Sequence, residues 1–363
     1  MADRNAALPA AFGAAAALIR LVAIYALCAC SGWLCARMGL PLPWMIGPLL
    51  TTAAMALSGM LPKALPVRTR PFGQAVVAST VGLSFTTEAL HVVIATLPLL
   101  VGMATMTAVL ALGLSVMQAR IARVRLSRMA LATFPVAPVE AAIIAESCGI
   151  PPAPVVMAQT LRIAAIVVTV PLLLYAIDGR PDALLPVRVA DAGHPALLAV
   201  VVLLAASGGQ IFRRLGWANP HFLGPLTLTA IVTASGIALP HYPPPVLAAA
   251  QILLGAWLGS TFQTHLFRGA WHEMVVSLIG TVLLLALTSG GALILARLSG
   301  LNWETAILGT APGGVTEMAL TAQYLRQDVA LVTAAHVVRI FLLMPLARPL
   351  IRLLDRHDRA DAT

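Results

Sequence analysis

Residues 308–325 read LGTAPGGVTEMALTAQYL. In this apolar run Pro312, Gly313 and Gly314 stand just before the carboxylate of Glu317. Proline removes a backbone donor and, together with glycine, interrupts a helix, so the segment is predicted to be a helix with a break. Freed backbone groups at membrane depth are tolerated only where they are buried in protein or line a cavity. The freed N–H groups could also bind an anion.

The same arrangement occurs 177 residues earlier, where residues 131–148 read LATFPVAPVEAAIIAESC. Glu140 aligns with Glu317, and Arg162 downstream aligns with Arg339. With the same shift and no gap, further Gly, Pro and polar residues coincide: Gln74 with Gln251, Pro48 with Pro225, Gly82 with Gly259, and Phe85 with Phe262. So many coincidences in a chain of mostly Ala, Leu and Val predict an internal duplication, with repeats at 1–185 and 186–363.

The composition points to a membrane protein. Of the 363 residues 60% are hydrophobic and 10% charged, whereas a soluble domain carries roughly 25% charged residues. Apolar segments fall into two series with the same rhythm, near 16–37, 44–60, 72–86, 90–117, 128–148 and 153–176, and near 196–214, 221–238, 246–263, 274–297, 303–325 and 329–351. The sequence therefore predicts an all-α integral membrane protein with 10–12 transmembrane or re-entrant helical segments in two internal repeats with broken helices, forming one transmembrane domain.

The net charge of +9 comes from basic residues in short loops between apolar segments. This pattern is typical of membrane insertion and predicts a lipid bilayer as partner, with no direct contact to nucleic acid. Sorting the loop Lys and Arg residues gives 15 on the side of the N-terminus and 5 on the other. This count of 15 to 5 is the same whether all six segments of each repeat cross the membrane or the fifth segment is a re-entrant hairpin. In the second case the two repeats would be inverted relative to each other. From the charges we expect both termini in the cytoplasm.

The aligned glutamates and arginines are the main candidates for chemistry. An ionised side chain at the bilayer centre costs roughly 2.5–3.5 kcal/mol, so Glu140, Glu317, Arg162 and Arg339 must face a wet cavity, the protein interior or one another. One hypothesis is that the glutamates bind a coupling proton or cation and the arginines bind them or an anionic solute. Alternatively, each glutamate occupies the third position of the resumed helix and stabilises its N-terminus, or the four residues form structural Glu–Arg pairs.

Three further polar residues lie inside apolar segments. Gln74 and Gln251 are candidates to line the same site, while the GxxxG step of Gly255 and Gly259 predicts close helix packing. His336, one turn before Arg339, is either a hydrogen-bonded interior residue or a proton relay. No catalytic triad, nucleotide-binding loop or complete zinc motif is present, and the four cysteines lack CxxC spacing. We therefore expect no enzyme activity, no cofactor and no metal site.

The duplicated Gly-Pro-Leu and Gln-x7-Gly-x2-Phe segments, together with Ala311-Pro312-Gly313-Gly314…Glu317-Met318 and the downstream His336-x2-Arg339, carry a family resemblance. The chain resembles the AbrB-duplication family of bacterial inner-membrane proteins, some members of which carry the label ammonia monooxygenase. The resemblance implies a multi-pass membrane protein, linked in some members to regulation of gene expression and suspected of transport. The first repeat departs from the pattern, with Pro-Val-Ala-Pro in place of Pro-Gly-Gly and Ala141 in place of Met318.

Internal repeats with interrupted helices at corresponding positions are typical of secondary transporters. The sequence thus favours a transporter or permease for a small solute, with an anion slightly preferred and a homo-oligomer left open. The site would contain Pro312, Gly313 and Gly314 together with the charged and amide residues above. The alternative is a membrane regulator or sensor that influences gene expression indirectly, through a separate protein partner.

Overall fold

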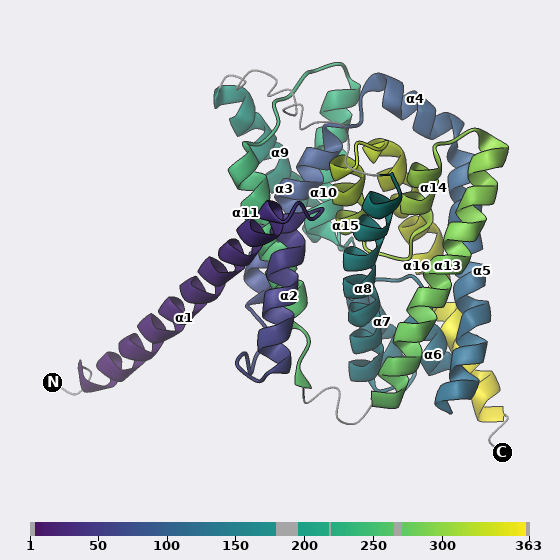
Figure 1. Ribbon diagram of the computed structural model, residues 1–363, viewed down its shortest axis with the longest axis horizontal. Coiled ribbons are helices and arrows are strands. Elements are labelled where there is room, and N and C mark those ends of the chain that lie inside the picture. Colours follow the sequence, from purple (N-terminus) through teal and green to yellow (C-terminus); the bar gives the residue numbers. More distant parts are fainter. Residues whose placement is uncertain (1–3, 179–194, 218, 265–270, 361–363) are drawn as a thin grey trace.

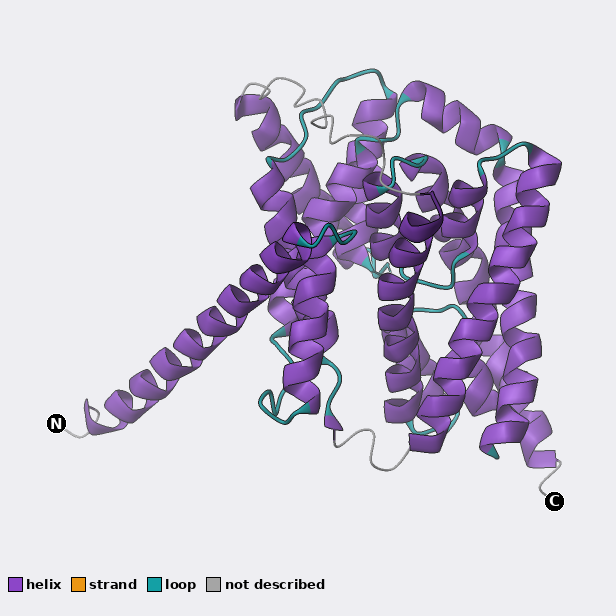
Figure 2. Cartoon of the chain, in the orientation of Figure 1, coloured by secondary structure: helices purple, strands orange, loops and turns teal. Residues whose placement is uncertain are grey.

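The computed structural model describes residues 4–178, 195–217, 219–264 and 271–360, and in these ranges the chain is helical with no strand (Figures 1 and 2). The helices of the first half are α1 (Arg4–Arg37), α2 (Pro43–Leu57), the short η1 (Val67–Thr69), α3 (Arg70–Gly82), α4 (Thr87–Ala95), α5 (Leu97–Ala122), α6 (Leu126–Thr133), α7 (Pro138–Ser147) and α8 (Pro152–Asp178). Those of the second half are α9 (Pro195–Arg214), α10 (Pro220–Ala234), α11 (Pro244–Ser260), α13 (Trp271–Ser299), α14 (Trp303–Thr310), α15 (Val315–Tyr324) and α16 (Val329–Ala360). The predicted boundary between repeats at residues 185 and 186 lies outside the described residues.

Six of the described helices are long and apolar enough to cross a bilayer: residues 18–37 of α1, then α5, α8, α9, α13 and α16. α3 and α4 would form a seventh candidate, but the pair is bent by 89°. Both predicted breaks are present, because the segment near 128–148 is split into α6 and α7 and the segment near 303–325 into α14 and α15. The prediction of an all-helical membrane protein is confirmed, with shorter helices between the long ones.

Equivalent helices of the two halves run in opposite directions. In Figure 1, α5 descends from α4 at the top while its equivalent α13 ascends, and α8 ascends while its equivalent α16 descends. α1 begins on the same lower side on which α16 ends. Of the two arrangements that the charges permit, the structure therefore has the inverted one.

Each half contributes one helix that packs against a helix of the other half, and the two pairs are equivalent. α2 packs on α11, and its equivalent α10 packs on α3. A side chain at Gly259 would collide with the carbonyl of Leu49, and one at the equivalent Gly82 would lie 2.9 Å from the carbonyl of Leu226. These glycines allow the backbones to approach closely, as the GxxxG step predicts. We call α1, α2, α3, α9, α10 and α11 the scaffold bundle.

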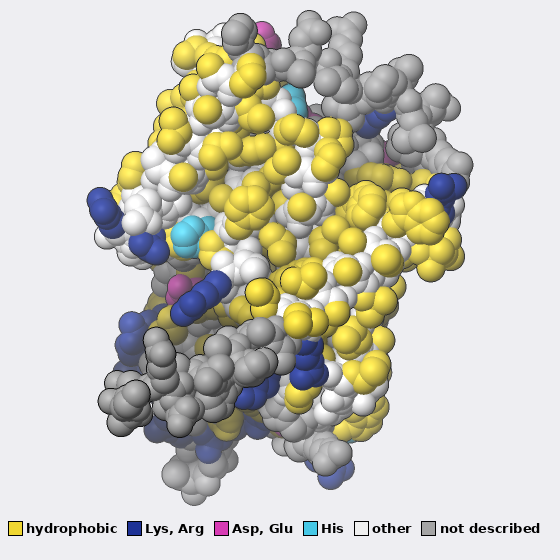
Figure 3. All heavy atoms as spheres, turned by 90° about the vertical axis from the view of Figure 1, so that its left-hand side faces the viewer, with side chains coloured by type: hydrophobic (Ala, Val, Ile, Leu, Met, Phe, Trp, Pro, Cys, Tyr) yellow, Lys and Arg dark blue, Asp and Glu magenta, His cyan; other side chains and the backbone are white. Residues whose placement is uncertain are grey.

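The remaining long helices and both broken helices form a second group beside the scaffold bundle, which we call the hairpin bundle: α5, α6, α7, α8, α13, α14, α15 and α16. A single large apolar core runs through both bundles, and it includes Leu49, Val77, Leu254 and Ala319. Outside this core, many large apolar side chains are exposed. Figure 3 shows them as a broad hydrophobic surface, with Lys and Arg side chains gathered mainly toward its lower part. This distribution suits a protein surrounded by lipid.

Candidate functional site

The second broken helix is a hairpin that enters and leaves on one side. Asn302, just before α14, donates from Nδ2 to Oε1 of Gln327, just after α15, at 3.1 Å. The hydroxyl of Thr305 donates to the same oxygen at 3.2 Å. The two ends of the segment are thus joined at one level, as in a re-entrant loop rather than a crossing. We call residues 302–327 hairpin 2.

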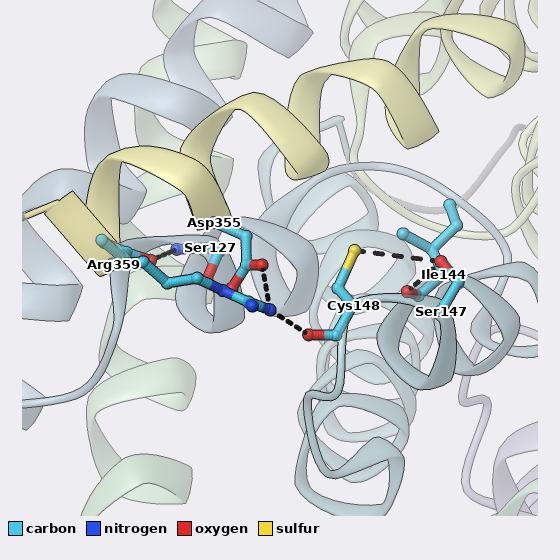
Figure 4. Close-up of polar contacts among 7 residues, drawn as sticks. Ser127, Ile144, Ser147, Cys148, Asp355 and Arg359 are labelled. Carbon is cyan, nitrogen blue, oxygen red and sulfur yellow. Dashed lines mark hydrogen bonds and ion pairs between the residues drawn. The ribbon is translucent and has the colours of Figure 1, made fainter.

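The first broken helix has its base at the opposite end of α16. Its two ends, residues 126 and 148, are bound by adjacent residues of that helix. Asp358 accepts hydrogen bonds from the backbone N–H groups of Leu126 at 3.2 Å and Ser127 at 2.8 Å. Arg359 donates to the carbonyl of Cys148 at 3.3 Å and pairs with Asp355 at 2.7 Å (Figure 4). We call residues 126–148 hairpin 1.

The hairpins approach each other from opposite faces. α16 begins at Val329, two residues after the base of hairpin 2, and its far end holds the base of hairpin 1. In Figure 1, α14 and α15 accordingly lie in the upper half of the molecule and α6 and α7 in the lower half. α8 connects the two tips, because Gly313 of hairpin 2 lies against its Ile166, one turn beyond Arg162, which binds the break of hairpin 1.

The two aligned arginines bind the broken backbone. Arg339 on α16 donates from Nη1 to the carbonyl of Ala311 at 2.7 Å and from Nη2 to that of Gly313 at 2.9 Å. Arg162 on α8 donates to the carbonyl of Thr133 at 2.5 Å. Cations are favoured at helix C-termini, where carbonyls lack partners. Neither arginine forms an ion pair with Glu140 or Glu317 within the described residues, so the contact that the structure gives these arginines is to carbonyls.

His336 is part of the same arrangement. It is fully buried, with Nε2 2.9 Å from the carbonyl of Leu308 and Nδ1 2.6 Å from Nη2 of Arg339. Since the guanidinium can only donate, Nδ1 accepts and Nε2 carries the proton. The histidine is thus a hydrogen-bonded interior residue that orients Arg339. Of the two interpretations of His336, this geometry matches the structural one.

Both glutamates stand at the start of a resumed half-helix. Gly314 is the N-cap of α15 and Glu317 its third residue, while Ala137 is the N-cap of α7 and Glu140 its third residue. Both side chains are partly exposed. The Glu317 carboxylate folds back over its helix start, so that a Cβ at Gly314 would collide with it. The predicted helix position is confirmed for each glutamate, and in it the free N–H groups of the first turn favour a negative charge.

The structure adds Arg70, which the sequence analysis did not single out. Its guanidinium lies over the ring of Trp257, 4.2 Å from the centroid, and within Coulombic range of Glu317. The side chain stands at the first position of α3, which packs on α15. The only sequence signal was its place next to Pro71, four residues before Gln74.

The two glutamines belong to the scaffold bundle. Gln74 on α3 is buried and donates to Oδ1 of Asn219 at 3.2 Å. Asn219 is the left-handed N-cap of α10, with a φ of 50° that asparagine tolerates. Gln251 is buried on α11 where this helix packs on α3. Gln74 therefore stabilises the N-terminus of α10, and this contact is enough to explain why a polar residue stands at position 74.

A groove of about 660 Å³ lies between the two bundles, formed mainly by α2, α8 and α13. It reaches from Leu161, next to Arg162, to Leu57 and Trp271. Its lining is mostly apolar, with the hydroxyls of Thr169 and Thr264 among the aliphatic side chains. Within the described part of the chain no three His, Cys, Asp or Glu side chains come together in a way that could hold a metal ion.

Comparisons with known proteins give one family profile and two curated relatives. A sequence profile of the family described as "Transition state regulatory protein AbrB" matches the chain twice, at residues 2–178 and 44–355. "Uncharacterized protein YhjN" of Bacillus subtilis (strain 168) is 31% identical over 231 residues, which cover 58% of this chain and 59% of that protein. "Putative regulator AbrB" of Escherichia coli (strain K12) is 28% identical over 144 residues, or 40% of this chain and 41% of that protein. The matched segments thus span less than two thirds of either relative. No solved structure matches the chain.

Proposed function

The chain belongs to the family described as transition state regulatory protein AbrB, and we propose that this member is a secondary transporter that moves a small organic solute across the bacterial inner membrane without converting it. One observation carries the proposal. Two re-entrant hairpins approach from opposite sides of an inverted duplication, and the tip of hairpin 2 lies against α8, whose Arg162 binds the break of hairpin 1. Inverted repeats with discontinuous helices at a shared midplane site are the typical construction of secondary transporters.

The proposed solute site lies where the half-helices α7 and α15 begin. Glu140 and Glu317 present their carboxylates there, and both are accessible because neither is fully buried. Arg162 and Arg339 act as positioning residues, since their donors bind the carbonyls of the breaks. Irregular backbone within a membrane needs partners of this kind. The two arginines no longer favour an anionic solute, because they already donate hydrogen bonds to backbone carbonyls.

The proposed orientation follows the positive-inside pattern. α1 begins and α16 ends at the lower side of Figure 1, where the base of hairpin 1 also lies. The end of α5, the loop after it and the end of α16 carry a cluster of arginines on this side, among them Arg120, Arg123, Arg352 and Arg356. Such clusters mark the cytoplasmic side. We therefore place both termini in the cytoplasm and the base of hairpin 2 on the periplasmic side.

A regulatory role is the second candidate, because the relative from Escherichia coli bears the printed name of a regulator. The described residues form membrane-type helices and short connections. A regulator built in this way would act through a separate cytoplasmic protein or through the concentration of the solute that it carries. The two roles are compatible if transport changes the level of an effector.

Solute flux decides between these functions. The full chain is reconstituted in proteoliposomes and tested with a panel of labelled metabolites, under an imposed proton or sodium gradient. We expect uptake of at least one solute, abolished in Glu317→Gln and retained in the matched control Glu146→Gln, since Glu146 is exposed on α7. Absence of flux for every solute, together with a cytoplasmic protein that co-purifies with the chain, would replace transport by the regulatory role.

A further inference from the structure

The contact between Arg70 and Trp257 joins α3 and α11 of the scaffold bundle. α3 and α11 carry these residues and pack against each other where the two halves of the molecule meet. The guanidinium lies 4.2 Å from the ring centroid, which is the geometry of a cation–π contact. Both side chains are partly exposed. The aromatic ring thus holds a planar cation in a fixed orientation without neutralising its charge.

Glu317 supplies the opposite charge from the hairpin bundle. It lies at the start of α15, which packs on α3, and it attracts Arg70 electrostatically. The two groups nevertheless form no direct ion pair within the described residues. The guanidinium is engaged by the indole ring, and the carboxylate folds back over the first turn of its own helix. A cation and an anion therefore lie within Coulombic range of each other at the boundary between the two bundles, each engaged by a group of its own bundle.

This pair occurs once, although the molecule is duplicated. The position equivalent to Arg70 is Leu247, and the position equivalent to Trp257 is Thr80. Glu140 therefore has no such arginine opposite it. A feature required only to hold the repeats together would be expected in both copies, as the close glycine contacts of Gly82 and Gly259 are. The single copy indicates a role in which the two hairpins differ.

We propose that Arg70 and Glu317 together bind a small zwitterionic solute, with a carboxylate on Arg70 and an ammonium group on Glu317. This inference rests on the proposed transport function and names its substrate class. A solute with only a negative charge would be repelled by Glu317, and one with only a positive charge by Arg70. A dipolar solute satisfies both, and the planar guanidinium suits a carboxylate because it can donate two parallel hydrogen bonds. α-Amino acids and related betaines have this chemistry.

Binding is measured first, with the purified full chain in detergent and thermal unfolding as the readout. The probes are the twenty common amino acids and glycine betaine, tested singly. For each amino acid that stabilises the protein, the corresponding deaminated acid and decarboxylated amine are tested as single-charge analogues. We expect at least one zwitterion to stabilise the chain while both of its analogues fail. No stabilisation by any probe, or equal stabilisation by a single-charge analogue, would overturn the inference.

Variants then locate the binding. Arg70→Gln and Glu317→Gln are each expected to lower the affinity for the zwitterion by at least tenfold. Arg68→Gln and Glu88→Gln, which alter exposed charges, should leave this affinity unchanged. The double variant Arg70→Gln/Glu317→Gln keeps the site neutral and controls for folding through its unliganded melting temperature. Unchanged affinity in both single variants would overturn the site.

Flux in proteoliposomes separates this inference from the proposed function. If a solute that is not zwitterionic is taken up, and Arg70→Gln does not change this uptake, the protein is a transporter but its substrate is not a zwitterion. If a zwitterion binds in a way that depends on Arg70 and Glu317, but no probe is transported, the binding site is correct and the transport function is wrong.

Discussion

Gln159 and His336 make the same contact in opposite halves of the molecule. Gln159 donates from Nε2 to the carbonyl of Leu131 at 2.7 Å, and Nε2 of His336 lies 2.9 Å from the carbonyl of Leu308. The two side chains are 177 residues apart, and so are the two carbonyls. Two chemically different residues thus stabilise the end of a broken helix in the same way, because an amide and a neutral imidazole can both place one donor at that position.

This equivalence predicts that His336→Gln is tolerated and His336→Ala is not. Loss of the side chain leaves a buried carbonyl without its donor and removes one of the three acceptors of Arg339, and a buried group left unsatisfied costs about 1–3 kcal/mol. We expect the melting temperature in detergent to stay near that of the wild type for His336→Gln and to fall clearly for His336→Ala. If the glutamine variant keeps its stability but loses a proton-driven flux, His336 is a proton relay and the structural interpretation is wrong.

Arg339 is expected to affect folding before it affects transport. Replacement by Ala leaves the carbonyls of Ala311 and Gly313 without these donors. Replacement by Lys keeps the charge but not the fork that reaches two carbonyls, so an intermediate loss is predicted. Thermal unfolding should rank the variants as wild type, Arg339→Lys, Arg339→Ala. The control is Arg348→Ala, which removes an exposed arginine from the same helix. Equal melting temperatures for all four proteins would contradict a role in capping.

The close approach of the two halves can be tested at Gly259. A Cβ there would meet the carbonyl of Leu49 and the hydroxyl of Thr52, both on α2. Overpacking of this kind typically costs about 1–3 kcal/mol, and a backbone atom cannot move away as a side chain would. Gly290→Ala is the matched control, because a Cβ added at this residue of α13 would have no other atom within 4 Å. That control should keep or raise stability, by up to about 1 kcal/mol from helix propensity.

The sequence predicted the helix breaks because the responsible signals are local. Pro135 and Pro312 interrupt the helical pattern at equivalent places, and the glutamates follow at a fixed spacing, so the N-terminal positions of α7 and α15 could be derived before any tertiary contact was known. The duplication was likewise visible as an uninterrupted shift. Loop charges could not decide between parallel and inverted repeats, since both arrangements leave the same arginines on each side.

The partners of the charged side chains could not be predicted in the same way. Arg162 and Arg339 looked like partners for Glu140 and Glu317, but the carbonyls freed by each break are nearer to them in the fold. Arg70 resembled an ordinary loop arginine, because its contact with Trp257 depends on how α3 meets α11. Contacts between residues almost two hundred positions apart follow from tertiary packing, and a single sequence does not contain that information.

The re-entrant topology makes a clear prediction for labelling. With the four native cysteines replaced by serine or alanine, Ser299→Cys and Arg326→Cys mark the two ends of hairpin 2 and should react with a membrane-impermeant maleimide from the same side. Arg120→Cys and Glu146→Cys mark the two ends of hairpin 1 and should both react from the other side. All four positions are exposed. If the two members of either pair react from opposite sides, that hairpin crosses the membrane and the inverted arrangement fails.

Asp358 is expected to control the opening of hairpin 1. Its carboxylate binds the N–H groups of Leu126 and Ser127 from another helix, in the manner of an N-cap, and such a cap contributes about 0.5–2 kcal/mol. Asp358→Ala should therefore speed amide hydrogen exchange in residues 126–148, with a smaller effect for Asp358→Asn, which keeps one acceptor. Hairpin 2 should be unaffected, since Asn302 and Gln327 close its base without help from α16. Arg356→Ala, one of the exposed arginines of α16, is the control, and equal exchange in Asp358→Ala and this control would show that the contact does not hold the hairpin.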